Sequence, residues 1–279
     1  MGEGRGGAPA RGEVVDAPVR RFRGGVASTE RDLLAVEAPL EIRLGSESFT
    51  VLMRTPGADE ELVTGFLVSE GIVASAEAIR ALSRPESLVE GDCDNFLAVE
   101  LVEPGAGPAT ERRFFASASC GVCGKSSIAD LEIRAEPVAS GLVFPAGLVE
   151  ALPERLRAAQ PAFAETGGLH GAALFDGAGE LLAAREDIGR HNAVDKLIGW
   201  AARNGRLPLT DAVLAVSGRL GFEIAQKAIV AGIPIVVSVG AASSVAVALA
   251  ERYGLTLATF VRAGSMNLYG RTERVRLPG

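Results

Sequence analysis

The chain has 279 residues, of which 48% are hydrophobic and 23% charged, a balance typical of a soluble globular protein with one large or two modest domains. Its 35 acidic and 28 basic side chains give a net charge of −7, which argues against general binding to the polyphosphate backbone of nucleic acids. Three cysteines, with one close pair, indicate a reducing, cytoplasmic setting rather than a disulfide framework. The N-terminal stretch has no apolar run as long as that of a signal peptide.

The first part of the chain, residues 26–136, is predicted to mix strands and helices and to follow a flexible tail of residues 1–25. Apolar and polar side chains alternate on both sides of Gly45, as in a β-hairpin with one buried face. Three acidic residues, 59–61, then suit the positive end of a helix. The elements expected here are a hairpin, a helix and two more strands, over residues 32–55, 59–70, 95–103 and 112–118.

From residue 137 to the end, strands alternate with helices, which is typical of an α/β domain. Short runs rich in Val, Ile, Leu and Ala predict strands over residues 172–176, 181–186, 212–217, 233–239 and 255–261. Longer segments predict helices over residues 148–160, 192–203, 222–232 and 243–254. The last three strands should be parallel, with ligands expected beyond their carboxyl ends.

One stretch is long enough to raise the question of a membrane span. Residues 228–250 carry no charged side chain. Gly232, Pro234 and Gly240 divide this stretch into an Ile/Val-rich strand and an Ala-rich helix, as a buried parallel strand unit requires. We therefore expect no membrane segment.

The sequence Cys-Gly-Val-Cys-Gly-Lys at 120–125 lies between a predicted strand and a predicted helix over 126–133. Cysteine attacks as the thiolate, and a nearby helix N-terminus and lysine lower the pKa of a thiol. Cys120 and Cys123, beside Lys125, are therefore placed for reactivity, and the glycines between and after them keep the loop accessible. Such a cysteine can accept a sulfane sulfur as a persulfide and hand it on.

Three other roles for this cysteine pair stay open: buried core cysteines, half of a structural zinc site, or a dithiol–disulfide oxidoreductase. Zinc needs four ligands, and only Cys93, His170 and His191 remain, each isolated in the sequence, so no metal site is predicted. Zinc deaminases need a His-x-Glu motif, which neither histidine provides. Thioredoxin-like proteins carry the motif near the start of a small domain, unlike this chain.

Three further segments carry polar groups suited to an anionic ligand. The stretch 185–196 is rich in charged residues; Arg190 and His191 could bind an anion at a helix start, where Asp187 could cap the helix or orient a base edge. The alternative is a solvated, salt-bridged helix start. At Arg219, and again in the run 260–265, an arginine lies near a glycine at the end of a predicted strand. This combination suits phosphate binding, and it also fits an ordinary turn from strand to helix.

His170, beside glycines, is a candidate base or hydrogen-bond donor near a ligand, and a structural role is equally compatible with its position. Together, six stretches resemble, in the same order, the formate dehydrogenase accessory sulfurtransferase family, FdhD. The likeness covers about residues 30–270. The stretches are residues 39–72, 119–127, 166–175, 185–199, 217–251 and 260–269.

This resemblance implies an α/β fold with a cytidine-deaminase-like three-layer core, a smaller mixed α+β N-terminal region, and a homodimer. It also implies a sulfurtransferase that takes sulfur from a cysteine desulfurase as a persulfide on Cys120, with Cys123 as its companion. The sulfur would pass to the molybdenum cofactor, Mo-bis(molybdopterin guanine dinucleotide), before its insertion into formate dehydrogenase. The competing role is a binding chaperone whose cysteines serve only structure. The residues expected to bind the cofactor are Arg219, Phe260, Val261, Arg262, Ala263, Gly264 and Ser265.

Overall fold

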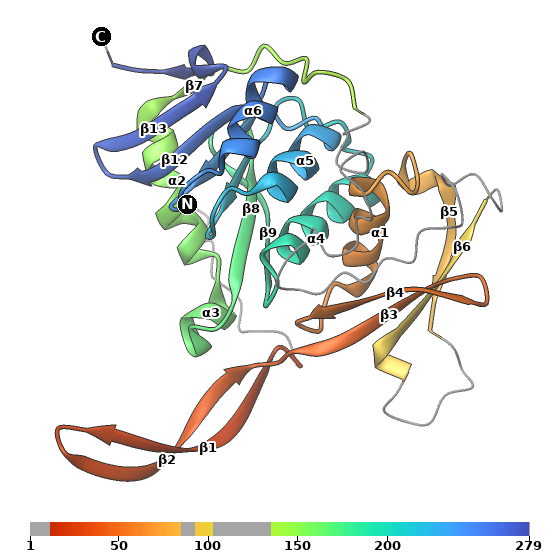
Figure 1. The fold of residues 1–279 in the computed structure, drawn as a ribbon, viewed down its shortest axis with the longest axis vertical. Helices are drawn as coiled ribbons and strands as arrows, with labels where there is room; N and C mark the ends of the chain where they lie inside the picture. Colours follow the sequence, from red (N-terminus) through yellow and green to blue (C-terminus); the bar gives the residue numbers. More distant parts are fainter. Residues whose placement is uncertain (1–11, 85–92, 103–134, 279) are drawn as a thin grey trace.

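The computed structural model describes residues 12–84, 93–102 and 135–278, which form a mixed α/β protein (Figure 1). Its largest sheet has six strands in the order β13-β12-β11-β10-β8-β9. Neighbouring strands β10, β11 and β12 are parallel, as expected, and the other pairs are antiparallel. The strands are β8 (His170–Phe175), β9 (Leu181–Asp187), β10 (Val213–Val216), β11 (Ile235–Ser238), β12 (Thr256–Arg262) and β13 (Ser265–Gly270).

Helices cover both faces of this sheet, because its strands are apolar on both sides. Val213 and Ala215 of β10 face the core cluster that contains α2, whereas Leu214 and Val216 face the cluster that contains α4 and α5. The result is a helix–sheet–helix arrangement; its relation to the cytidine deaminase fold stays a prediction. The helices are α2 (Ala146–Ala158), α3 (Pro161–Thr166), α4 (Arg190–Arg203), α5 (Phe222–Val230) and α6 (Ser244–Tyr253).

The N-terminal region adds a four-stranded sheet in the order β4-β3-β6-β5 and one long helix. The helix begins at Asp59, as its acidic first turn predicts. The expected hairpin around Gly45 is confirmed as β3 and β4. These elements are β3 (Ala38–Leu44), β4 (Glu47–Arg54), α1 (Asp59–Ser69), β5 (Ile79–Ser83) and β6 (Phe96–Leu101).

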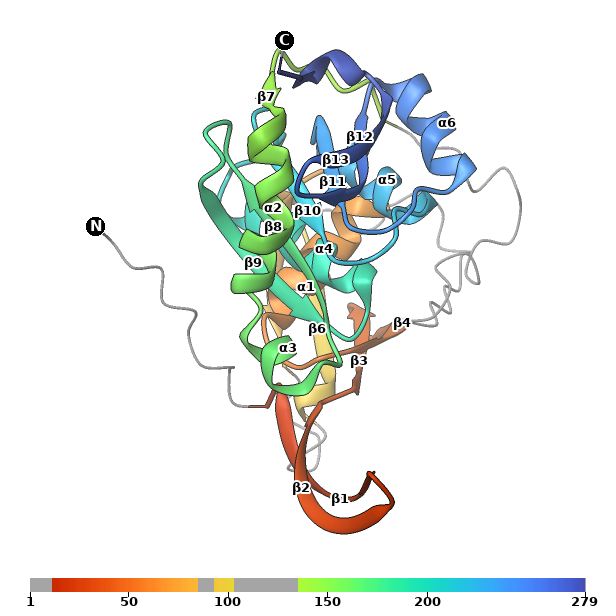
Figure 2. The ribbon, with the colours of Figure 1, turned by 90° about the vertical axis from the view of Figure 1, so that its left-hand side faces the viewer.

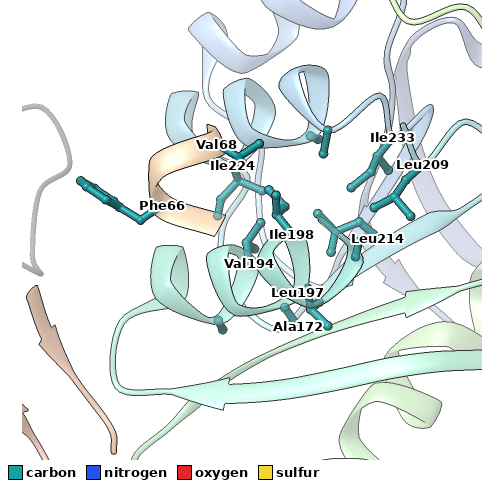
Figure 3. Packing of buried hydrophobic residues seen from close by; sticks show 14 of the residues in the cluster. Phe66, Val68, Ala172, Val194, Leu197, Ile198, Leu209, Leu214, Ile224 and Ile233 are labelled. Carbon is teal, nitrogen blue, oxygen red and sulfur yellow. The ribbon is translucent and has the colours of Figure 1, made fainter. Parts of the chain in front are cut away.

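Helices α1 and α4 cross in direct backbone contact, here called the α1–α4 seam. A Cβ added at Gly65 would overlap the Asp195 carbonyl oxygen, and one added at Gly199 would overlap the Glu61 carbonyl oxygen. Figure 3 shows apolar side chains of α1, α4 and α5 meeting beside the sheet. The N-terminal region and the six-stranded sheet therefore share one hydrophobic core cluster.

A long two-stranded ribbon precedes these elements and extends away from the body in both views (Figures 1 and 2). It consists of β1 (Val14–Arg23) and β2 (Val26–Ala35), and we call it the arm. The expectation of a flexible tail over residues 1–25 is wrong from Val14 onward. The reason is a two-residue turn, Gly24–Gly25, whose positive φ angles of 57° and 84° match the twist of a tight hairpin.

The remaining elements are short. Two-residue strands pair in parallel near the C-terminus, and short 3-10 turns complete the described chain: β7 (Phe144–Pro145), β14 (Val275–Arg276), and turns at Ala76–Ala78, Cys93–Asn95 and Thr272–Arg274. The strand expected over 112–118 and the helix over 126–133 lie outside the described residues. Within the part that is described, no helix has the length and apolarity needed to cross a bilayer.

Candidate functional site at the strand ends

Polar side chains gather at one edge of the six-stranded sheet. The carboxyl ends of β9, β10, β11 and β12 meet there, together with the N-termini of α4, α5 and α6, because each helix directly follows a strand. His170 starts β8, which runs antiparallel to β10, and it pairs with Asp187 at the end of β9. His170 therefore lies at the same edge, here called the strand-end edge.

Gly218 is the point where several predicted residues meet. A Cβ placed on it would lie 3.5 Å from Nδ1 of His170 and 3.6 Å from Cδ of Arg190, so both side chains pass directly over this glycine. The Ser238 hydroxyl donates to Gly218 O (2.5 Å) and accepts from the Gly240 N–H (2.9 Å). This buried serine holds the loops after β10 and β11 together.

Both histidines at this edge are held neutral. Burial, followed by the nearby charges of Arg190 and Lys227, lowers the pKa of His191 to about 3. Burial and the Arg190 charge also lower the pKa of His170. His191 Nε2 lies 3.6 Å from a Glu223 carboxylate oxygen, too far for a hydrogen bond, and has no partner among the described residues. Neutral imidazoles can hydrogen-bond a ligand, and arginines supply the positive charge.

The segment from Phe260 interrupts the pairing of β12 with β13 by a shift in register between Thr259 and Arg262. Phe260 has a φ of 51°, a left-handed conformation that costs a residue with a side chain on the order of 1–3 kcal/mol. Phe260 is 42% exposed, whereas the next residue, Val261, is buried. The exposed turn that follows is closed by the Gly264 N–H, which donates to a Glu150 carboxylate oxygen (3.0 Å).

Gly240 brings the two predicted cofactor-binding segments together. The Phe260 N–H donates to Gly240 O (3.1 Å), and a Cβ on Gly240 would lie 3.1 Å from Cα of Arg219. Arg219 and Arg262 are both exposed. The edge thus combines an exposed aromatic ring with two exposed guanidinium groups, which suits stacking and phosphate binding.

The family described as FdhD/NarQ matches residues 35–276. The chain belongs to the FdhD/NarQ family. It is 48% identical, over 92% of its length and 96% of the relative's, to a protein named "Sulfur carrier protein FdhD" from Mycobacterium tuberculosis. It is 46% identical to a protein of the same name from Anaeromyxobacter dehalogenans, over 99% and 98% of the two lengths.

A solved structure also resembles this FdhD/NarQ protein. It is described as that of a formate dehydrogenase accessory protein from Desulfotalea psychrophila, and it superposes with a TM-score of 0.71 at 25% identity. The match covers 94% of this chain and 99% of the other. The mixed α/β architecture of the FdhD/NarQ chain is therefore shared over nearly its whole length.

Asp187 is buried and occupied by structural contacts in this FdhD/NarQ protein. One of its oxygens lies 2.8 Å from Lys196 Nζ and accepts from the Thr55 N–H (3.2 Å). The other accepts from the Gly189 N–H (2.8 Å) and the Asn192 amide (2.9 Å). Asp187 therefore fixes the start of α4 through contacts within the fold; its ion pair is buried, whereas the alternative predicted a solvated, salt-bridged helix start.

Sequence reasoning missed a second buried polar layer beneath the histidines. Lys227 Nζ lies 2.8 Å from Asp195 and 3.1 Å from Glu70, and the Ser69 hydroxyl donates to Asp195 (2.7 Å). Burial, opposed by the Lys227 charge, raises the pKa of Asp195 to about 6. Asp195 follows His191 by one helical turn, so the four-residue spacing that places both side chains on one face of the helix was the available signal.

The predicted sulfur-carrying residues Cys120 and Cys123 lie outside the described residues, and their role stays a prediction. Over the described ranges, no three His, Cys, Asp or Glu side chains come together in a group that could hold a metal ion.

A cavity of about 480 Å³ lies at the start of α1, and no strand-end residue lines it. There Asp59 is already matched by Arg54 (2.9 Å) and Arg84 (2.8 Å). The polar groups of this cavity are thus largely satisfied within the fold, and the strand-end edge is the better candidate site.

Proposed function

We propose that this chain is a cytoplasmic sulfurtransferase for formate dehydrogenase maturation: it receives sulfur from a cysteine desulfurase as a persulfide and transfers it to Mo-bis(molybdopterin guanine dinucleotide). The observation that carries the proposal is the likeness, at 48% identity over 92% of the chain, to a protein named as a sulfur carrier. The sequence supplies what that role requires, a Cys-x-x-Cys motif followed by a glycine and a lysine.

In the first step the Cys120 thiolate attacks the outer sulfur of the donor's persulfide. A new S–S bond forms on Cys120, the donor's own S–S bond breaks, and the donor leaves as a thiolate with the bonding electron pair. In the second step the sulfane sulfur would leave Cys120, which returns to the thiolate, and the reduced metal centre of the acceptor would supply the two electrons that convert this sulfur to a bound sulfide. Cys123 would tune the reactivity of its neighbour or release an unused persulfide by forming a disulfide.

The strand-end edge would hold the cofactor, which is the substrate of the transfer. A guanine base would stack on the exposed ring of Phe260, and the phosphates would meet Arg219 and Arg262. A local basic site is needed, because the chain as a whole carries −7 and repels an anion elsewhere. Arg190 and the neutral His170 lie close enough to Gly218 to add contacts from the next strand end.

Mass spectrometry after incubation with a cysteine desulfurase and cysteine tests the carrier role. The chain should gain the mass of one sulfur atom, removable by reductant, and Cys120→Ala should abolish the gain and leave formate dehydrogenase inactive. The matched variant Cys123→Ala should still gain the sulfur. A binding chaperone would show no gain in any variant, and an oxidoreductase would instead lose two hydrogen atoms reversibly.

Binding of GDP, as a probe of the guanine dinucleotide, tests the second site. Arg219→Ala with Arg262→Ala should weaken GDP at least tenfold, because both phosphate contacts are lost. Arg276→Ala, an exposed arginine on β14, is the matched control and should leave affinity unchanged. Equal GDP affinity in the double variant and the wild type would exclude the strand-end edge as the cofactor-binding site.

A further inference from the structure

Two polar side chains at the strand-end edge face each other without bonding. His191, in the first turn of α4, and Glu223, in the first turn of α5, approach to 3.6 Å between Nε2 and a carboxylate oxygen. This distance is too long for a hydrogen bond, and because burial keeps His191 neutral the two form no ion pair. In the part of the chain that the structure describes, no hydrogen bond reaches His191 Nε2 or either Glu223 carboxylate oxygen.

Both groups are largely removed from bulk water. The side chains of His191 and Glu223 are only 13% and 14% exposed. Polar atoms that folding removes from water cost free energy unless they gain a hydrogen-bond partner. A glutamate in the first turn of a helix is favoured by the helix dipole, but the dipole alone leaves the hydrogen-bonding capacity of the carboxylate unused. The pair is therefore suited to a ligand that supplies the missing partner atoms.

The pair lies beside the residues proposed to bind the cofactor. The Glu223 carboxylate folds back towards the loop after β10, since a Cβ added to the glycine two positions earlier would lie 3.3 Å from one of its oxygens. This loop carries Arg219, and it pairs with the loop after β11 through a bridge between Leu220 and Ala242. The Phe260 N–H donates to that second loop. A continuous series of backbone contacts therefore joins the pair to Arg219 and Phe260.

The carboxylate and the imidazole place hydrogen-bond acceptors beside a donor. A carboxylate accepts two hydrogen bonds side by side, and a neutral imidazole donates one when its proton is on Nε2. The complementary ligand edge shows a carbonyl oxygen, a ring N–H and an amino group, in that order. Guanine has this edge, and the pterin ring has the same one. Adenine has a ring nitrogen acceptor in place of the N–H, so its lone pair would face the carboxylate.

We propose that Glu223 and His191 are specificity-determining residues that bind the amino-oxo-pyrimidine edge shared by guanine and pterin. Glu223 accepts hydrogen bonds from the ring N–H and the amino group, and His191 Nε2 donates to the carbonyl oxygen. This inference rests on the proposed function, because the molybdopterin guanine dinucleotide is the ligand that carries both rings. It also explains a carboxylate in a site for an anion: the arginines bind phosphate, whereas Glu223 disfavours rings with a different edge.

Exchange of the carboxylate for an amide tests this assignment. Glu223→Gln replaces one acceptor by an NH₂ donor, which matches xanthine, in which an oxygen replaces the amino group of guanine. The variant should bind GDP at least tenfold more weakly than the wild type does, and xanthosine diphosphate at least tenfold more tightly. Glu251→Gln, which changes an exposed glutamate on α6, is the matched control and should alter neither affinity. Equal urea midpoints of the two variants show that both are folded.

Pterin and lumazine, its dioxo counterpart, test the second source of the same edge. If the pterin end of the cofactor lies against Glu223, then Glu223→Gln should leave GDP affinity unchanged, weaken pterin at least tenfold and strengthen lumazine by a similar factor. Titration followed by the fluorescence of these two compounds measures both affinities. An exchange of preference in either pair of compounds supports the assignment, and the pair in which it occurs identifies the ring that Glu223 binds.

A Glu223→Gln variant that binds all these compounds as the wild type does would overturn the inference. The cofactor site itself would survive that result if Arg219→Ala with Arg262→Ala still weakens GDP, so the two failures are distinguishable. A wild type that binds none of the compounds counts against both proposals. His191→Leu removes the donor to the carbonyl oxygen and should weaken GDP and xanthosine diphosphate by the same factor, because both bases keep that oxygen. Unchanged affinities in this variant would remove His191 from the assignment.

Discussion

The α1–α4 seam, which Lys227 reaches from α5, and the arm contain ion pairs of the same length in opposite surroundings. Lys227 and Asp195 lie 2.8 Å apart with side chains 3% and 2% exposed, and Arg31 and Asp16 lie 2.8 Å apart with side chains 64% and 51% exposed. Inside the seam, loss of one partner leaves the other charge buried and unpaired. On the arm, water solvates the charge that remains. Two ion pairs of equal length therefore do not contribute equally to stability, because their burial differs.

A bulky substitution at the glycine crossing of the α1–α4 seam should lower the free energy of unfolding more than any other single substitution. Gly65→Val places side-chain atoms where the Asp195 carbonyl lies, so the two helices must separate and the shared core opens. We expect a loss of more than about 4 kcal/mol, enough to prevent stable folding. Soluble yield and the urea midpoint measure it.

Gly147→Ala is the matched control, a helical glycine with open space around its Cβ. It should be neutral or slightly stabilising, because alanine favours a helix by about 0.5–1 kcal/mol. If Gly65→Val unfolds at the same urea concentration as the wild type, the close helix crossing described here is wrong.

Removing the buried lysine should cause the next largest loss in the free energy of unfolding. Lys227→Met leaves Asp195 uncompensated in the seam and should cost about 3–5 kcal/mol at pH 8. Burial already raises the pKa of Asp195 above its usual value, and losing Lys227 raises it further. A carboxyl whose pKa is raised by folding favours the folded state at low pH and loses that contribution as pH rises, so the defect should shrink at pH 5.

Urea denaturation of the variant at both pH values measures this effect. The double variant Asp195→Leu with Lys227→Met, which removes both charges, should recover part of the lost stability. A defect of the same size at pH 5 and pH 8 would show that the stranded carboxylate is not its cause.

His191 should make the folded protein sensitive to acid. Its pKa falls from 6.5 to about 3 on folding, mainly through burial. Between these two pH values His191 is therefore protonated in the unfolded chain and neutral in the folded chain. The stabilising contribution is present above pH 6.5 and is lost as pH falls towards 3. At pH 4.5 the loss attributable to His191 should be about 2–3 kcal/mol.

Comparison with His191→Gln isolates this contribution, because glutamine keeps polar atoms but does not titrate. The free energies of unfolding of the two proteins should diverge between pH 7 and pH 4.5, with the wild type falling more steeply. Parallel pH profiles would mean that His191 is as accessible to protons in the folded chain as in the unfolded one.

Elements with a strong local pattern could be predicted from the sequence. The hairpin around Gly45, the acidic start of α1 and the parallel order of β10, β11 and β12 all follow from alternation, capping and buried apolar runs. The arm was missed because its apolar residues are interspersed with arginines and Pro18, and Gly24–Gly25 resembles a loose tail. A strand that does not pack against the hydrophobic core has little alternation of apolar and polar residues by which it can be predicted.

The candidate site was predictable to the extent that it follows from the strand ends. Parallel strands end at one edge, so the proximity of Arg219 and Phe260 could be expected, and Gly240 provides it. The approach of His191 to Glu223 and the ion pair of Asp195 with Lys227 could not be expected, because each brings together residues 32 positions apart, and their proximity depends on how α4 packs on α5. Such contacts arise from tertiary packing, which local patterns do not encode.

The smallest effect should come from the exposed pair on the arm. Arg31→Ala removes a 2.8 Å contact to Asp16, the same distance as in the seam, but water solvates both side chains before and after the change. The urea midpoint should not move beyond measurement error. A clear destabilisation would mean that the arm is held by its own ion pairs, and the contrast with Lys227 would then rest on something other than burial.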